Sequence, residues 1–201
     1  MLGYGPRAVL AEYGSLEEVM AAAAHLRAAV GAGRLTGVVD IVPAARTVLV
    51  HHDGRVDAAL LAGVLADVSP LDAGEGPLVE IVVRYDGEDL RAVADACGLT
   101  AAEVVDLHTS AEYTAAFCGF VPGFAYLIGL APRLHLPRRS TPRTRVPAGS
   151  VAIAAEYAAV YPSATPGGWH LLGTTDAVLW DDERDPPALI EPGSHVRFVP
   201  A

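Results

Sequence analysis

Glycine, proline and aromatic residues recur throughout residues 117–169, and they divide this part of the chain into short segments separated by turns. Many short strands joined by Gly/Pro turns are typical of a closed or nearly closed β-barrel. The pattern therefore predicts a mainly-β domain over residues 77–201. We expect its strands at 113–120, 151–155, 159–161, 170–174, 178–180 and 195–199, after two short helices at 88–97 and 100–108.

Residues 1–76 follow a different pattern, in which helices alternate with strands. Ser15 and Glu18 form a capping-box pair ahead of an apolar stripe with helical spacing, which predicts a first helix. Residues 56–68 have the same spacing and are the predicted second amphipathic helix. Strands are expected at 7–13, 36–42 and 46–51, and a further strand follows at 78–85, just beyond this part of the chain. This order suits an α+β domain of the ferredoxin-like type. Residues 69–77, rich in turn-forming and polar residues, are the predicted linker.

The composition describes a globular, acidic protein, with 52% hydrophobic and 19% charged residues and a net charge of −10. This charge argues against nucleic acid or an anionic membrane as the main partner. No apolar run approaches the ~20 residues of a transmembrane helix, and the N-terminus lacks a signal-peptide pattern. Cys97 and Cys118 are not in a C-x-x-C motif, which fits reduced thiols. We therefore expect a cytoplasmic protein without membrane contacts.

All 14 basic residues are arginine, and the chain contains no lysine. A P-loop and a Schiff-base lysine are thereby excluded within this chain. If the protein contacts ATP, it must do so through arginine, backbone N–H groups and hydroxyls.

Five of these arginines lie within residues 107–173, where Glu112 and Glu156 are the only acidic residues. Composition alone favours a loop-rich β domain whose arginines pair with the acidic remainder of the chain. The alternative is a site for an anionic ligand or partner.

Three long motifs occur in order: G-F-x-P-G-F-x-Y-L-x-G-L at 119–130, P-R-R-x-x-P-R-x-x-V-P-A-G-S-V-A-I at 137–153, and Y-P-x-x-x-P-G-G-W at 161–169. Together they resemble the family of the 5-oxoprolinase B subunit, which includes the Kip inhibitor of a sporulation kinase and is also labelled allophanate hydrolase subunit 1. Flanking segments at 42–53, 85–94, 103–113 and 192–198 agree with the family pattern. The resemblance covers nearly the whole chain.

The resemblance implies a cyclophilin-like barrel for the second domain. It also implies one component of an ATP-dependent 5-oxoprolinase, which hydrolyses 5-oxo-L-proline to L-glutamate together with a homologous C subunit and an A subunit. ATP, with or without Mg²⁺, would be bound largely by those partners, and we expect this chain to be inactive alone.

The competing interpretation is a non-catalytic binding protein that inhibits a sensor histidine kinase, as the Kip resemblance implies. Neighbouring genes for the other oxoprolinase components would favour the enzyme. The third label, allophanate hydrolase, needs a Ser-Ser-Lys amidase apparatus, which a chain without lysine cannot supply.

His108 is the candidate catalytic residue, because an imidazole can act as general base near neutral pH. The equally open alternative is that its ring caps the end of a helix. Phe124 and Tyr126, on a Pro-Gly turn, are expected to be exposed as a binding wall, with Phe120 in the core. We expect His108, Tyr113, Phe124, Tyr126 and Trp169 to converge at one barrel mouth.

Arg138, Arg139 and Arg143 lie in a proline-stiffened segment and are candidates for binding substrate or nucleotide. The alternative for them is interdomain ion pairing. Gly167 and Gly168, before Trp169, offer N–H groups for an anion nest.

Ser150 is not in a G-x-S-x-G motif, so we expect its hydroxyl to serve the backbone or a ligand rather than act as nucleophile. Tyr157 and Ala158 replace a Gln-Thr pair that is usual in the family, which puts the identity of the ligand in doubt. No His, Cys and carboxylate set has metal-ligand spacing, so no metal is expected.

Overall fold

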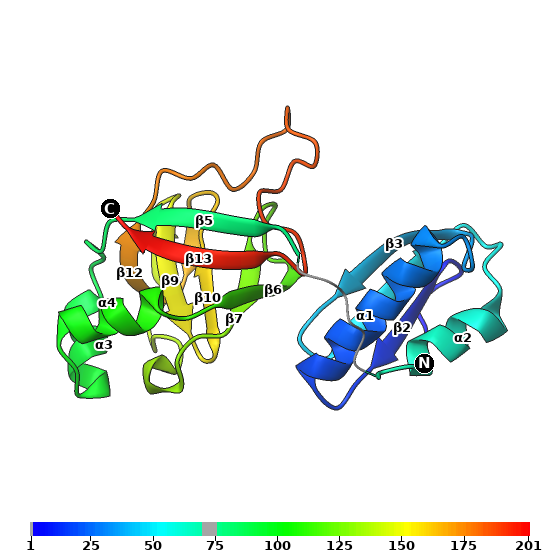
Figure 1. Ribbon diagram of the computed structural model, residues 1–201, viewed down its shortest axis with the longest axis horizontal. Helices are drawn as coiled ribbons and strands as arrows, with labels where there is room; N and C mark the ends of the chain where they lie inside the picture. The colour runs from blue at the N-terminus through cyan, green and yellow to red at the C-terminus, as the bar shows by residue number, and fades with distance from the viewer. Residues whose placement is uncertain (1, 70–75) are drawn as a thin grey trace. The chain divides into compact units, whose positions relative to one another are not determined.

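The computed structural model describes residues 2–69 and 76–201, and the chain divides into two compact units, Met1–Gly74 and Glu75–Ala201 (Figure 1). The predicted linker falls largely on residues 70–75, which lie outside the described residues. Among the described helices, none is long and apolar enough to span a membrane.

The N-terminal unit is an antiparallel sheet of order β1-β2-β4-β3 that packs against two helices (Figure 1). Inward side chains of β4, Val48 and Val50, share one core with Leu26 of α1 and Leu61 and Leu65 of α2. The elements are β1 (Leu2–Gly3), β2 (Ala8–Glu12), α1 (Leu16–Gly31), β3 (Val38–Pro43), β4 (Thr47–His52) and α2 (Ala58–Ala66).

The strand expected at 78–85 does not complete this sheet. It forms β5 (Leu78–Val83), which pairs in parallel with β13 (His195–Pro200) in the other unit. The fourth strand of the N-terminal sheet is instead β1, which folds back on β2 with Leu2 opposite Leu10. The ferredoxin-like assignment of this unit stays a prediction.

The C-terminal unit is built on a mixed seven-stranded sheet of order β12-β9-β10-β7-β6-β13-β5, which forms a nearly closed barrel (Figure 1). Arg84, after β5, and Thr174, at the end of β12, exchange two 2.8 Å backbone hydrogen bonds and so join the two edge strands. The remaining elements are α3 (Leu90–Cys97), α4 (Ala101–Thr109), β6 (Tyr113–Cys118), β7 (Ala125–Ile128), η1 (Pro132–Leu134), β8 (Arg143–Val146), β9 (Ser150–Ala154), β10 (Tyr157–Val160), β11 (Thr165–Gly167) and β12 (His170–Thr174).

Both faces of this sheet are buried where β7, β10 and β9 lie side by side. Val151 and Ile153 of β9 point into the barrel interior. Ala152 and Ala154, which alternate with them, belong to a second apolar cluster that also contains Trp169. The two-stranded ribbon of β8 and β11 contributes Val146 to this outer cluster. The register of β9 therefore assigns neighbouring residues to two separate cores.

Several local predictions are confirmed, and one strand is wrong. Thr100 and Glu103 form the complete capping box at the start of α4. Residues 178–180 are not a strand, because this segment lies in a loop where Trp180 makes only an isolated bridge to Ala188. The sequence pattern missed β7, β8 and β11, which are three or four residues long.

Candidate functional site

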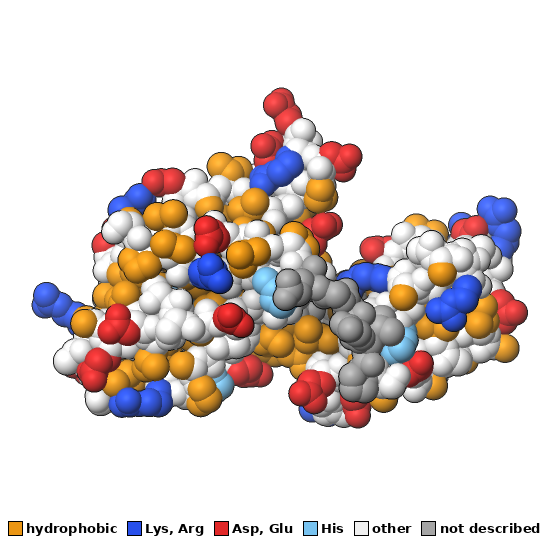
Figure 2. Space-filling model, in the orientation of Figure 1, with side chains coloured by type: hydrophobic (Ala, Val, Ile, Leu, Met, Phe, Trp, Pro, Cys, Tyr) orange, Lys and Arg blue, Asp and Glu red, His pale blue; other side chains and the backbone are white. Residues whose placement is uncertain are grey.

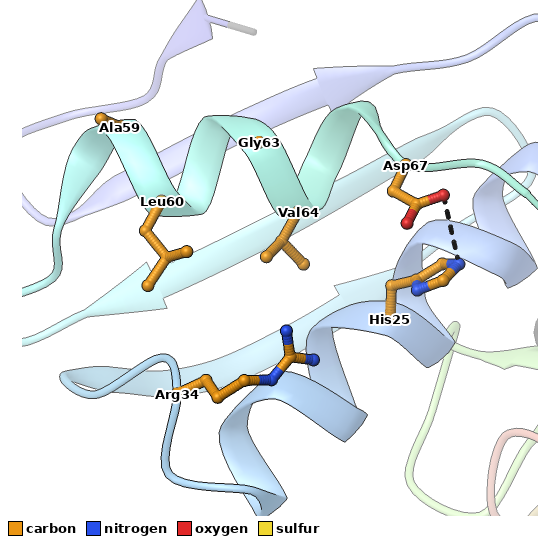
Figure 3. A pocket seen from close by; sticks show the side chains of 7 residues that line it. All are labelled: His25, Arg34, Ala59, Leu60, Gly63, Val64 and Asp67. Atoms are coloured by element: carbon orange, nitrogen blue, oxygen red, sulfur yellow. Dashed lines mark ion pairs between the residues drawn. The ribbon is translucent and has the colours of Figure 1, made fainter.

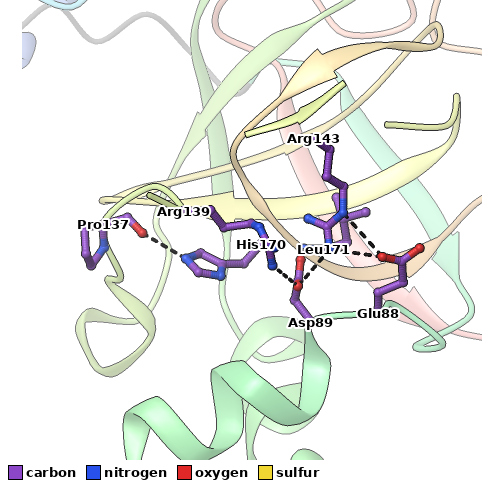
Figure 4. A network of polar contacts seen from close by, with 7 residues as sticks. All are labelled: Glu88, Asp89, Pro137, Arg139, Arg143, His170 and Leu171. Atoms are coloured by element: carbon purple, nitrogen blue, oxygen red, sulfur yellow. Dashed lines mark hydrogen bonds and ion pairs between the residues drawn. The ribbon is translucent and has the colours of Figure 1, made fainter. Parts of the chain in front are cut away.

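A buried carboxylate, that of Asp89, holds the arginine segment to the start of α3 (Figure 4). Its Oδ1 accepts hydrogen bonds from Arg139 Nη1 at 2.6 Å and from Arg143 Nη2 at 2.9 Å. Its Oδ2 accepts the backbone N–H of Leu171 at 2.8 Å. Glu88 adds a second acceptor for Arg143, with Oε2 3.1 Å from Nη2. We call Glu88, Asp89, Arg139 and Arg143 the arginine clamp.

The electrostatics of the clamp favour the charged forms of its members. Burial by itself raises the pKa of Asp89, but hydrogen bonds from Arg143 and Leu171 and the charges of Arg143 and Arg139 lower that pKa overall. The pKa of Arg143 is raised, first by its hydrogen bond to Asp89. Because the Asp89 side chain is only 5% exposed, its charge is neutralised by protein rather than by water.

For Arg139 and Arg143, these contacts favour ion pairing over the binding of an anionic ligand. Arg139 and Arg143 form ion pairs, but within the C-terminal unit and not between domains. On the face shown in Figure 2, basic side chains of this unit lie singly among acidic ones. Glu88 and Asp89 thus neutralise part of the positive charge of the arginine segment.

Arg138 differs from the two clamp arginines. Its side chain is exposed, and no ion pair is recorded for it among the residues that the structure describes. Its guanidinium lies 5.9 Å from the centroid of the Trp169 ring, within the range of a cation–π contact. A pocket of about 550 Å³ opens beside it, lined by Ala96, Leu136, Pro137, Arg138, Arg139, Ser140, Thr141 and His170.

Phe120 and Phe124 of the first motif have exposures opposite to those expected, and Tyr126 is half-buried. Phe124 is only 2% exposed, whereas Phe120 is 58% exposed. Phe120 has φ of +74°, a conformation that L-residues rarely adopt. Phe124 instead packs edge-on against Trp169 at 5.5 Å, and Tyr126 lies 5.7 Å from the same ring. Phe124 is therefore a core residue of the outer cluster rather than an exposed wall.

The predicted anion nest does not form at Gly167 and Gly168. Gly167 ends β11 and lies opposite Arg143 of β8, and neither glycine has the positive φ that a nest requires. A Cβ on Gly167 would overlap the Tyr161 hydroxyl. Glycine is needed here for close packing, and the Gly168 carbonyl accepts the Arg139 N–H at 2.8 Å.

His108 is completely buried in the barrel interior. Its Nδ1 lies 2.8 Å from the Tyr85 hydroxyl, and its ring packs 4.5 Å from Phe198. Its Nε2 has no hydrogen-bond partner among the described residues, and the ring does not cap α4 either. Tyr113 donates its hydroxyl to the His108 carbonyl at 3.0 Å. Burial lowers the pKa of His108 to about 3, so the imidazole is neutral at physiological pH.

The prediction that five residues converge at one barrel mouth is wrong. Tyr113 belongs to the interior core and packs against His108 there. Phe124, Tyr126 and Trp169 belong to the cluster on the outer face of the same sheet. The strand alternation that separates the two cores separates these groups, so His108 does not face the aromatic cluster.

The other candidate residues serve local packing. The buried Ser150 donates its Oγ to the Pro147 carbonyl at 2.8 Å. Tyr157, at the first position of the replaced Gln-Thr pair, packs 5.6 Å from Tyr126, and burial raises its pKa to about 12. The described residues contain no cluster of three or more His, Cys, Asp or Glu that could hold a metal ion.

A second, smaller pocket of about 330 Å³ lies in the N-terminal unit between α1 and α2 (Figure 3). His25 at one end lies 3.4 Å from Asp67, and Arg34 lies across from Leu60 and Val64. It contains none of the predicted site residues.

Asp89 is the main residue that the sequence reasoning missed. A signal was present, since Glu88 and Asp89 form an acidic pair at the start of a helix in the family segment 85–94. Clustered arginines near a core also favour a nearby carboxylate. Nothing in the sequence pattern, however, brought residues 89 and 139 together.

The C-terminal unit is thus a nearly closed mixed barrel that carries the arginine clamp. The family model "Carboxyltransferase domain, subdomain C and D" matches residues 1–190, and the chain belongs to this family. The resemblance to the 5-oxoprolinase B subunit is confirmed by relatives with that name.

Among these relatives, the 5-oxoprolinase B subunit of Escherichia coli O157:H7 is 53% identical over 129 residues, which cover 63% of this chain and 59% of the relative. That of Bacillus subtilis (strain 168) is 46% identical over 125 residues, or 61% of this chain and 52% of the relative. The matches therefore span only about half to three fifths of these relatives. The solved structure of TTHA0988 is 40% identical with a TM-score of 0.83, over 97% of this chain and 40% of that one.

Proposed function

We propose that this chain is one component of an ATP-dependent 5-oxoprolinase, which opens 5-oxo-L-proline to L-glutamate together with a C subunit and an A subunit in the cytoplasm. The observation that carries the proposal is the 53% identity to a 5-oxoprolinase B subunit. The cyclophilin-like description of the barrel is part of the same proposal.

The chemistry explains why ATP and several subunits are needed. A five-membered lactam is a resonance-stabilised amide that water attacks only slowly. Transfer of the γ-phosphoryl group of ATP to the lactam oxygen releases ADP and gives a phosphorylated imidate. Water then adds to the same carbon, and cleavage of the ring C–N bond leaves the acyl phosphate of glutamate. A second water hydrolyses this acyl phosphate to glutamate and inorganic phosphate. Charge develops on phosphoryl oxygens throughout, so the site requires fixed cationic donors.

This chain can supply such a donor, but His108 cannot be the base. Arg138 borders an open pocket, and the arginine clamp fixes the backbone next to it. His108 is 0% exposed and faces Tyr85 and Phe198 in the barrel interior, so it cannot reach a substrate as general base. We assign the activation of water to the partner subunits.

Co-expression of this chain with the A and C subunits is expected to yield one stable complex that releases glutamate from 5-oxoproline only when ATP is present. The chain alone should be inactive. A specific interface should bury more than ~1,000 Å², so size-exclusion chromatography at micromolar concentration should resolve a single assembly. Separate monomers without activity would contradict the proposal, and inhibition of sensor-kinase autophosphorylation by the isolated chain would favour the binding-protein alternative.

A further inference from the structure

The three arginines of the second motif do not share one role. Arg139 and Arg143 direct their charge to a carboxylate that is 5% exposed, and their own side chains are 35% and 16% exposed. Arg138, between Pro137 and Arg139, projects to the surface, with its guanidinium over the Trp169 ring. Its N–H donors are therefore available to a ligand.

The pocket beside Arg138 has the composition of an anion site. Its lining residues include two arginines and two exposed hydroxyls, those of Ser140 and Thr141, and no carboxylate. His170 also lines it and is held by a hydrogen bond from Nε2 to the Pro137 carbonyl at 2.8 Å (Figure 4). Because the carbonyl is only an acceptor, that nitrogen carries the proton. The wall next to these donors is apolar, formed by Ala96 and Leu136.

The number of donors and the size of the pocket favour a phosphate group over a carboxylate. A carboxylate has two oxygens, whereas a phosphate group presents three strong acceptor oxygens. Arg138 and the two hydroxyls can satisfy all three. The volume of about 550 Å³ is also in the range of sites that enclose ligands much larger than 5-oxoproline.

We propose that this pocket binds a phosphate-bearing ligand of nucleotide size, with Arg138 as its principal cation and with Arg139 and Arg143 as positioning residues held by Asp89. The nucleotide identity of the ligand rests on the proposed function. The pocket itself rests on the geometry of this chain.

The chain offers a direct test without its partners, because it contains only two tryptophans, Trp169 and Trp180. In a Trp180→Phe background, the emission of Trp169 reports on the guanidinium stacked over it. ADP, inorganic phosphate, adenosine and 5-oxoproline are each titrated into this protein, into its Arg138→Gln variant and into a matched Arg145→Gln variant. Arg145 is exposed, lies on β8 and does not line the pocket.

ADP is expected to change the emission saturably, while adenosine at the same concentration should not. Arg138→Gln should weaken ADP binding by about tenfold or more, the effect of losing a charge-assisted hydrogen bond. Arg145→Gln should leave the affinity within about twofold, since exposed charges interact weakly. Equal effects of the two variants, or saturation by 5-oxoproline but not by ADP, would overturn the assignment. If the chain binds ADP as expected but its complex with the A and C subunits does not hydrolyse 5-oxoproline, the oxoprolinase proposal is refuted and the pocket assignment stands.

Discussion

Asp89→Ala is expected to lower the free energy of unfolding of the C-terminal unit by about 3–5 kcal/mol, the cost of leaving a buried charge without its partner. The change removes the acceptor of Arg139, of Arg143 and of the Leu171 N–H in a single step. Urea unfolding followed by tryptophan emission measures the loss, because Trp169 and Trp180 both lie in this unit.

The matched control is Glu88→Gln, which removes the neighbouring carboxylate of the same clamp. Its side chain is 75% exposed, so this change should cost at most about 1 kcal/mol. Equal midpoints for the two variants would show that Asp89 does not hold the fold together.

Replacing Arg139 and Arg143 together by glutamine has a related consequence. It leaves the Asp89 carboxylate buried without its two cations, so we expect a large loss of stability as well. A loss of activity in that double variant would therefore not identify a ligand-binding role. Arg138→Gln is the informative change for ligand binding.

His108 is expected to make the C-terminal unit sensitive to acid. Its pKa is about 3 in the folded protein and about 6.5 in an unfolded chain, so between these values the unfolded state binds a proton that the folded state does not. Stability should then fall by about 1.4 kcal/mol for each pH unit below 6.5. Urea unfolding at a series of pH values from about 7 down to about 4.5 would measure that slope.

His108→Phe should flatten this pH dependence, although it leaves the Tyr85 hydroxyl without its partner and lowers stability at neutral pH. His51→Gln, which removes an exposed histidine of the N-terminal unit, is the control and should leave the slope of the C-terminal unit unchanged. A direct measurement is the NMR signal of the His108 ring, which should remain that of neutral imidazole at about pH 5, below the ordinary pKa of a histidine. A protonated ring at that pH would contradict the prediction.

The difference between the expected and observed exposures of Phe120 and Phe124 has a physical cause. Both flank the same Pro-Gly turn, and their sequence context does not distinguish them. In the structure, Phe124 leads directly into β7 and covers the outer face of the sheet, where Tyr161 and Trp169 meet it. Phe120 lies in the turn with a positive φ, and its ring is largely exposed to solvent.

The amino-acid sequence by itself determined the family, the helix caps and most strands of the barrel. These features depend on residues close together in the chain, such as the Thr100–Glu103 capping box. Only the tertiary structure decided that Asp89 neutralises Arg139 and Arg143 and that Arg138 faces a pocket. It also decided that Tyr113 of β6, which packs on His108, faces the barrel interior while Tyr126 of β7 faces the outer cluster, because strand register, set by distant pairings, assigns alternate side chains to opposite faces.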